Sequence, residues 1–251
     1  MKYRLIFLIS LMIISCYPEN DIKPEEVIDF TIFPNDDILA DGSTKHKIKV
    51  LMDEDADPML RTLNFKCTSG SFVGSSSDKP MELETKAKFF NEEIFAEIEW
   101  IASTSPGEVI ISCDPVIEDK QGLFLVERSL TTVKSEVATL ELTVNAFSVH
   151  NNFDSEVTIT GSLKNSAKGG VSSGVTVKLR DIYITDQSEV GGRYRAESLV
   201  SGSNSSISAI YTPGNVPSGQ DIYIIGTVMN GEMPMNEIKQ DTVILQITQS
   251  N

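Results

Sequence analysis

Short runs in which apolar and polar residues alternate dominate this 251-residue sequence. In residues 45–52, KHKIKVLM, alternation places Ile48, Val50 and Met52 on one face of an extended chain and lysines on the other. Successive side chains of a β-strand point to opposite faces of its sheet, so this period of two predicts a strand with one buried face. The same pattern groups the apolar residues of six further segments: 63–67, 96–102, 109–113, 140–146, 157–163 and 175–179.

Gly, Pro, Asn, Asp and Ser separate these runs, and no stretch keeps a helical period over three turns. Short, half-buried strands joined by such turns are typical of antiparallel sandwiches. The sequence therefore predicts an all-β chain of two sandwiches, residues 28–135 and 136–251. The boundary falls in TTVKSEVATLEL, where a closing strand meets an opening strand. Because this link is short, the sandwiches are expected to stack end to end with limited freedom.

The first 15 residues have the order of features of a secretory signal peptide. Lys2 and Arg4 precede an apolar run that is shorter than the roughly 20 residues needed to cross a bilayer. The following Ile13-Ile14-Ser15-Cys16 resembles the lipobox of bacterial lipoproteins. In that family the cysteine is lipidated and becomes the new N-terminus. An ordinary signal peptide that happens to contain a cysteine is the alternative.

Lipidation at Cys16 would tie the chain to a membrane through its own N-terminus, because two or more acyl chains give stable attachment. Residues 16–27 contain two prolines and four acidic residues and are expected to form a polar tether. Acidic residues just after the cysteine resemble an export signal of Bacteroidota lipoproteins. The expected location is the outer membrane, with the protein lipid-anchored and displayed at the cell surface.

Several turns and strands of residues 28–135 resemble the bacterial Ig-like module of invasins and intimins, the Big-1 type. The resemblance lies in Ala40-Asp41-Gly42, the alternating strand 48–52, and Thr68-Ser69-Gly70 followed by Phe72. The second half, including GSLKNSAKGGVSSGVTVKL, resembles the same superfamily but lacks the Ala-Asp-Gly signature. The resemblance implies two tandem Ig-like antiparallel β-sandwiches, used as a stalk or adhesive module, with no catalytic residues.

Charge and cysteine content narrow the possible functions. The formal net charge is −15 and both halves are acidic, which argues against a nucleic-acid partner. If Cys16 carries lipid, Cys67 and Cys113 remain as a pair in a compartment that permits disulfides. Alternation places both on inward faces, and the strand order of the resembling family brings their strands close together. We therefore treat the pair as a disulfide candidate, with two buried free thiols as the alternative.

Two motifs suggest chemistry but fit turns better. The segment DEDADP, with Asp53, Asp55 and Asp57, begins like a calcium loop but lacks the glycine and glutamate that such a loop needs. Residues 170–174, GVSSG, match the nucleophile motif G-x-S-x-G. That motif needs a helix after the serine, whereas a predicted strand follows here. We expect no metal, no cofactor and no enzymatic activity.

The predicted function is adhesion, or a scaffold or stalk role, through a protein partner. The alternative is a glycan-binding accessory lipoprotein of a polysaccharide-capture system, which a groove lined by exposed aromatic residues would favour. The tether would hold the first sandwich near the membrane, so contact is expected in distal loops of the second, residues 201–206 and 212–220. The candidate partner-binding residues there are Tyr211, Tyr223, Asn204 and Asn215. Tyr183 and Tyr194 are further aromatic residues of this half.

Overall fold

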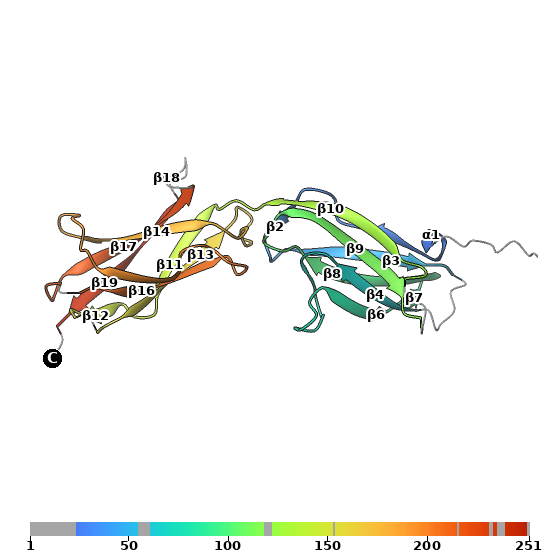
Figure 1. Ribbon diagram of the computed structural model, residues 1–251, viewed down its shortest axis with the longest axis horizontal. Helices are drawn as coiled ribbons and strands as arrows, with labels where there is room; N and C mark the ends of the chain where they lie inside the picture. Colours follow the sequence, from blue (N-terminus) through green and yellow to red (C-terminus); the bar gives the residue numbers. More distant parts are fainter. Residues whose placement is uncertain are drawn as a thin grey trace, which may run out of the picture.

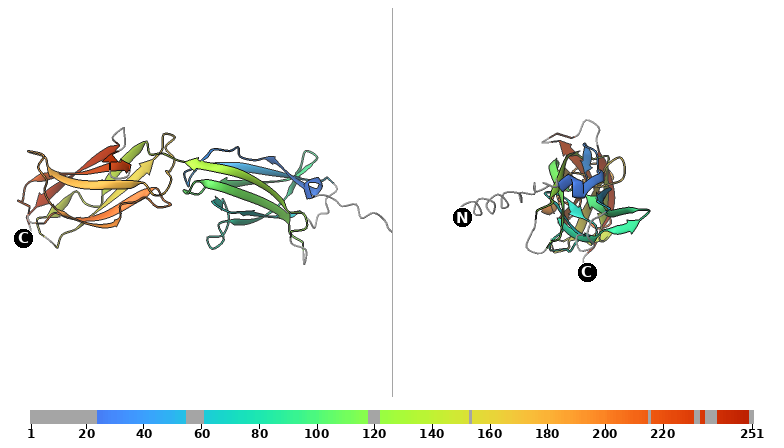
Figure 2. Two further views of the ribbon diagram at one scale, coloured as in Figure 1. Left: turned by 45° about the horizontal axis from the view of Figure 1, so that its top comes forward. Right: turned by 90° about the vertical axis from the view of Figure 1, so that its right-hand side faces the viewer.

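The computed structural model describes residues 24–54, 61–117, 122–152, 154–214, 216–230, 233–234 and 239–249. These residues form two β-sandwiches that lie end to end (Figure 1). Viewed along the long axis, one sandwich projects onto the other (Figure 2). The first sandwich has an entry end, where the chain enters from residue 24, and a second end that faces the other sandwich. The second sandwich ends in a far end, where the C-terminal strand finishes.

Two sheets make up the first sandwich. One has the strand order β1 (Ile28–Ile32), β3 (Lys45–Met52), β8 (Glu93–Ile101), β5 (Ser71–Phe72), with β7 (Lys88–Phe90) also paired to β8. The other has the order β2 (Ile38–Ala40), β10 (Val126–Lys134), β9 (Gly107–Pro115), β4 (Thr62–Cys67), β6 (Glu82–Lys86).

The second sandwich repeats this plan. One sheet has the order β11 (Thr139–Val144), β13 (Val157–Lys164), β16 (Ser206–Thr212), β15 (Arg193–Ser198). The other has the order β12 (Ser148–His150), β19 (Gln240–Thr248), β17 (Asp221–Asn230), β14 (Thr176–Tyr183), with β18 (Met233–Pro234) beside β17.

In each sandwich the opening segment forms two strands, one in each of the two sheets. Its second piece pairs in parallel with the closing strand, as β2 does with β10 and β12 with β19. The other strand pairs described here are antiparallel. Together with two facing sheets, this strand order is that of an Ig-like sandwich. The predicted all-β class and the tandem Ig-like sandwiches are therefore confirmed.

Each sandwich has its own apolar core, as the alternating runs predict. The first core extends from Ile28 to Leu130 and the second from Val137 to Ile247. The predicted boundary at 135/136 lies between the two cores, in the link between β10 and β11. Within the predicted tether, however, α1 (Pro24–Val27) forms one helical turn, and Val27 packs against the first core. That part of the tether is folded because the half-buried side chain of Val27 packs against the core.

Candidate functional site

The joint between the two sandwiches is a hydrogen-bonded contact built mainly from turns. Residues 40–44 and Thr104 of the first sandwich meet the β13–β14 connection of the second. Ser172 donates its hydroxyl to the carbonyl of Ala40 at 2.9 Å. The amide of Ser173 donates to the carbonyl of Thr104 at 3.0 Å. The β13–β14 connection therefore contacts the first sandwich at two separate backbone positions.

The linking segment is bound to this same connection. Ser135, which is fully buried, donates its amide to the hydroxyl of Ser172 and its own hydroxyl to the carbonyl of Gly170, both at 2.9 Å. The amide of Ser172 donates back to the carbonyl of Ser135 at 3.1 Å, and the side-chain amide of Asn165 donates to the Ser135 hydroxyl at 3.1 Å. Four bonds thus hold one linker residue, so the link is part of the packed structure.

Asp41 shapes the loop of the first sandwich that enters the joint. Its carboxylate accepts hydrogen bonds from the backbone amides of Ser43 and Thr44, at 2.8 and 2.9 Å, and from the Thr44 hydroxyl. Burial opposes ionisation of this carboxyl, but these hydrogen bonds outweigh it and lower its pKa. The Ser43 hydroxyl, held in this turn, accepts a hydrogen bond from the amide of Gly170 at 3.0 Å. The Ala-Asp-Gly motif therefore belongs to the joint.

Gly170 lies at a close approach of the two backbones. A Cβ atom on Gly170 would lie 2.1 Å from the carbonyl oxygen of Asp41 and 2.7 Å from the hydroxyl oxygen of Ser205. A Cβ on neighbouring Gly169 would lie 2.9 Å from a carboxylate oxygen of Asp41. Contacts this short do not occur for real Cβ atoms, so glycine is required for the sandwiches to approach this closely.

The G-x-S-x-G segment is a turn, as predicted, but its contact with the first sandwich was not. Ser172 is buried, and its hydroxyl bonds two backbone groups, the amide of Ser135 and the carbonyl of Ala40. Paired glycines such as Gly169-Gly170 are a sequence signal of close backbone approach. They do not indicate which other segment approaches.

The loop 201–206 lies at the joint rather than at the far end, so this part of the prediction was wrong. Ser206 pairs with Ser162 near the end of β13, and the following Lys164 pairs with Thr139, where the link enters. Asn204 lines a hollow of about 250 Å³ together with Asp41 and Lys168. Strand direction decides at which end of a sandwich a connection lies, and the alternation of residues within a strand does not give that direction.

Tyr211 is a core residue, which corrects its assignment as a contact residue. It is fully buried, its ring lies 5.0 Å from that of Tyr194, and its hydroxyl donates to Asp181 at 2.7 Å. Burial and the carboxylate of Asp181 both raise the pKa of Tyr211, which therefore stays protonated. The alternation Ile207, Ala209, Tyr211 in β16 would have indicated this inward position.

Of the remaining predicted site residues, the structure describes Tyr223 but not Asn215 or Cys16. Tyr223 is half-buried in β17, where its cross-strand neighbour is the exposed Ile244. Asn215 lies outside the described residues, as does Cys16. Tyr223 therefore remains a candidate on the outer face of the sheet, whereas Asn215 and Cys16 stay predictions from the sequence.

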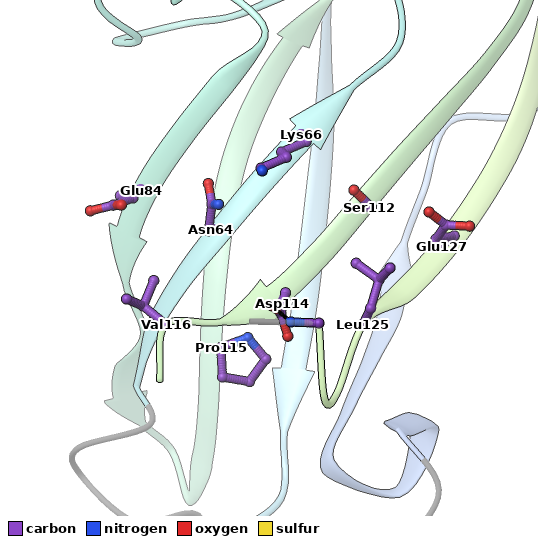
Figure 3. Close-up of a pocket in the computed structure, with 10 residues that line it drawn as sticks. Asn64, Lys66, Glu84, Ser112, Asp114, Pro115, Val116, Leu125 and Glu127 are labelled. Atoms are coloured by element: carbon purple, nitrogen blue, oxygen red, sulfur yellow. Dashed lines mark hydrogen bonds between the residues drawn. The ribbon is translucent and has the colours of Figure 1, made fainter. Parts of the chain in front are cut away.

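A groove of about 390 Å³ lies on the outer face of the first sandwich, over β4, β6 and β9 (Figure 3). Asp114 lines the groove and accepts a hydrogen bond from the amide of Gly122 at 2.6 Å. Its other carboxylate oxygen is buried without a partner in the described part of the chain. The remaining lining residues are Asn64, Lys66, Glu84, Ser112, Pro115, Val116, Leu125 and Glu127. None of these is aromatic, so the groove lacks the feature that would favour glycan binding.

Cys67 and Cys113 do not form the predicted disulfide, and both thiols are free and buried. Their strands are adjacent, as expected, but Cys67 lies opposite Ile111 and Cys113 lies opposite Phe65. The two cysteines are diagonal neighbours, whose separation of about 7–8 Å exceeds the reach of a disulfide. Burial raises the pKa of the Cys67 thiol to about 11 and raises that of Cys113 too. Both thiols are therefore protonated and unreactive in the folded protein.

Neither a metal-binding group nor a helix suited to span a membrane occurs among the residues that the structure describes. Within those residues, no group of three or more His, Cys, Asp or Glu side chains could hold a metal ion. Asp55 and Asp57 of the acidic turn lie outside them. No helix in the described ranges is long and apolar enough to cross a membrane.

No protein-family model matches the chain, and no curated protein matches it. Solved structures are similar over most of its length. The adhesin InvE of Yersinia pseudotuberculosis is 13% identical with a TM-score of 0.40, and the match covers 87% of this chain but only 58% of InvE. The D0-D1 domain of intimin is 15% identical with a TM-score of 0.31, covering 88% of this chain and 100% of that one.

The extracellular domains 3–5 of Drosophila OTK are 7% identical with a TM-score of 0.41, and the match covers 89% of this chain and 66% of that three-domain chain. This chain thus spans less than two thirds of the InvE structure. At these identities and TM-scores the similarities assign neither a family nor an activity. The function is therefore inferred from the chain's own residues.

Proposed function

We propose that this protein is a non-catalytic, lipid-anchored surface module whose two sandwiches form a stiff rod. The joint is the observation that carries the proposal. Domains joined only by a small polar contact are expected to move relative to one another. In this protein, by contrast, the linker itself is part of the contact, because the buried Ser135 bonds to Ser172 and Ser172 bonds to Ala40 of the first sandwich. A stiff rod keeps its far end at a set distance from its anchor, which suits a spacer or an adhesive module.

The far end of the rod is where we propose that a protein partner binds. Phe147, between β11 and β12, is 73% exposed, although its carbonyl accepts a hydrogen bond from the amide of Gln246 at 2.9 Å. When a partner covers an exposed aromatic ring whose backbone is already held in place, binding loses little conformational entropy. Aromatic residues with this property are frequent binding hot spots.

Replacing Phe147 by serine should weaken partner binding by about thirtyfold, because truncating a hot-spot side chain costs about 2 kcal/mol. The measurement is attachment of intact cells to host or neighbouring-cell surfaces, compared between wild type and Phe147→Ser. The matched control is Ile110→Ser, which removes an exposed apolar side chain from a sheet face of the first sandwich. Equal attachment by wild type and Phe147→Ser would contradict contact at the far end.

The proposed anchor is tested separately. Cells fed a palmitate analogue should label the wild-type protein and leave Cys16→Ala unlabelled, because Cys16 is the residue that the lipobox-like segment places for acylation. Surface protease treatment of intact cells should digest the labelled protein if it is displayed outside. Equal labelling of wild type and Cys16→Ala would show that lipid, if present, is attached elsewhere.

A further inference from the structure

Large apolar side chains are exposed at the entry end of the first sandwich. Phe89 and Phe90, in β7, are 66% and 63% exposed. The strand register places them at this end: Phe89 pairs with Ile94, and Ile94 pairs with Met52. Met52 in turn lies opposite Ile28, the first residue of β1. The two rings are therefore beside the point where the chain enters the fold, and Figure 1 shows β7 and α1 at the same end.

A second hairpin adds to this surface from the other sheet. The connection between β9 and β10 exposes Val116, Leu123 and Leu125. Val126 pairs with Cys113 near the close of β9, so this connection also lies at the entry end. We call these five residues the apolar tip: Phe89, Phe90, Val116, Leu123 and Leu125.

The two phenylalanines of the apolar tip lie in a hairpin with a two-residue turn. Asn91 and Glu92, which join β7 to β8, both have positive φ, at 51° and 65°. Two such residues form the tight hairpin turn whose twist matches that of its strands. Neither ring belongs to the core cluster, although their strand is hydrogen-bonded to β8. Their exposure therefore reflects a folded hairpin that presents them outward.

We infer that the apolar tip contacts the surface of the phospholipid bilayer in which the lipid is anchored. This inference rests on the proposed lipid at Cys16. The eight Cα–Cα steps from Cys16 to Pro24 span at most about 28 Å when fully extended. A tether this short holds the tip at an effective concentration of order millimolar near the bilayer. Weak apolar contacts are then sufficient, and the second contact point sets the orientation of the rod.

The charges around the apolar tip suit a zwitterionic surface. Lys86 and Lys88 are exposed beside the rings, and the carboxylates of Glu92 and Glu93 lie in the same hairpin. Glu93 is paired with Lys49 at 2.7 Å. Asp53 and Glu54, which follow Met52, are exposed at the same end. Charges of both signs therefore surround the apolar tip. Apolar side chains at the boundary between headgroups and acyl chains supply the attraction, which grows with the apolar area they bury.

The test places a tryptophan in the apolar tip of the anchored protein. Residues 16–251 are coupled through the Cys16 thiol to maleimide phospholipid in phosphatidylcholine vesicles, since Cys67 and Cys113 are buried. Emission from Phe89→Trp is compared between vesicles with and without bromine on the acyl chains. The matched control is Phe147→Trp, an exposed ring at the far end of the rod. Trp100, which is buried, gives the same background in both variants.

Bromine should quench the emission of Phe89→Trp and leave that of Phe147→Trp unchanged. Equal emission from Phe89→Trp in both kinds of vesicle would overturn the membrane contact. Self-association of the unanchored protein that Phe90→Ser abolishes would also overturn it, in favour of a second copy of the chain. Because chemical coupling supplies the anchor, this result does not depend on lipidation in cells. The palmitate experiment with Cys16→Ala tests that separately.

Discussion

Replacing Gly170 by valine should make the rod flexible at its joint. A Cβ atom at this position would lie 2.1 Å from the backbone oxygen of Asp41, so the two sandwiches must move apart. Separation would break the hydrogen bonds from Gly170 to Ser43, from Ser172 to Ala40 and from Ser173 to Thr104. Each such bond contributes about 1 kcal/mol. Losing all three is therefore enough to let the two sandwiches adopt many relative orientations in place of one.

The measurement is the distance between spin labels at Lys66→Cys and Lys178→Cys, one on each sandwich, in residues 17–251. The wild-type joint should give a narrow distance distribution and Gly170→Val a broad one. The matched control is Gly202→Ala in a neighbouring loop, where an added Cβ would meet nothing closer than the Asn204 side-chain oxygen at 3.8 Å. A narrow distribution in Gly170→Val would mean that the joint does not depend on this close approach.

Replacing Trp100 by alanine should destabilise the first sandwich by about 3–5 kcal/mol, the range for removal of a fully buried large aromatic side chain. Trp100 is completely buried in β8, and its indole nitrogen donates to the carbonyl of Ser69 at 3.1 Å. The backbone at Gly70 lies against the ring, since a Cβ there would be 2.6 Å from that nitrogen. Domains of this size are stable by about 5–15 kcal/mol, so the loss is a large fraction of the total.

Calorimetry on residues 17–251 measures this effect for each sandwich. The transition of the first sandwich should move to a much lower temperature, while that of the second should stay near its wild-type position because the two cores are separate. Trp100→Phe is the matched control: it keeps most of the apolar volume and loses the bond to Ser69, a cost of about 1–3 kcal/mol. A change below about 1 kcal/mol for Trp100→Ala would contradict the central place of this residue in the core.

Local patterning was enough to determine the faces of the strands. Ile48, Val50 and Met52 are buried as their alternation predicts, and so are Val109 and Ile111. A strand side chain can face only two ways, so a period of two decides which residues are inside as soon as one face is apolar. The same rule applied to SISAIY would have placed Tyr211 in the core.

The outcome at the two cysteines was decided by strand register. Alternation predicts correctly that Cys67 and Cys113 point inward, and β4 and β9 are neighbours. A bridge needs the two residues to lie directly opposite each other or nearly so, and they are offset by two positions. Register results from the packing of the whole sheet, so neither cysteine's own segment contains this information.

The sequence by itself determined the all-β class, the two sandwiches and the inward faces of their strands. Only the tertiary structure showed that Ser135, Ser172 and Gly170 meet Ala40 and Asp41 in one joint. It also showed that loop 201–206 lies at this joint and that two hairpins expose apolar residues at the entry end. The physical reason is that the faces of a strand follow from contacts between residues close in the chain. Which ends and turns meet depends on strand direction and sheet order, which arise from contacts over more than a hundred residues.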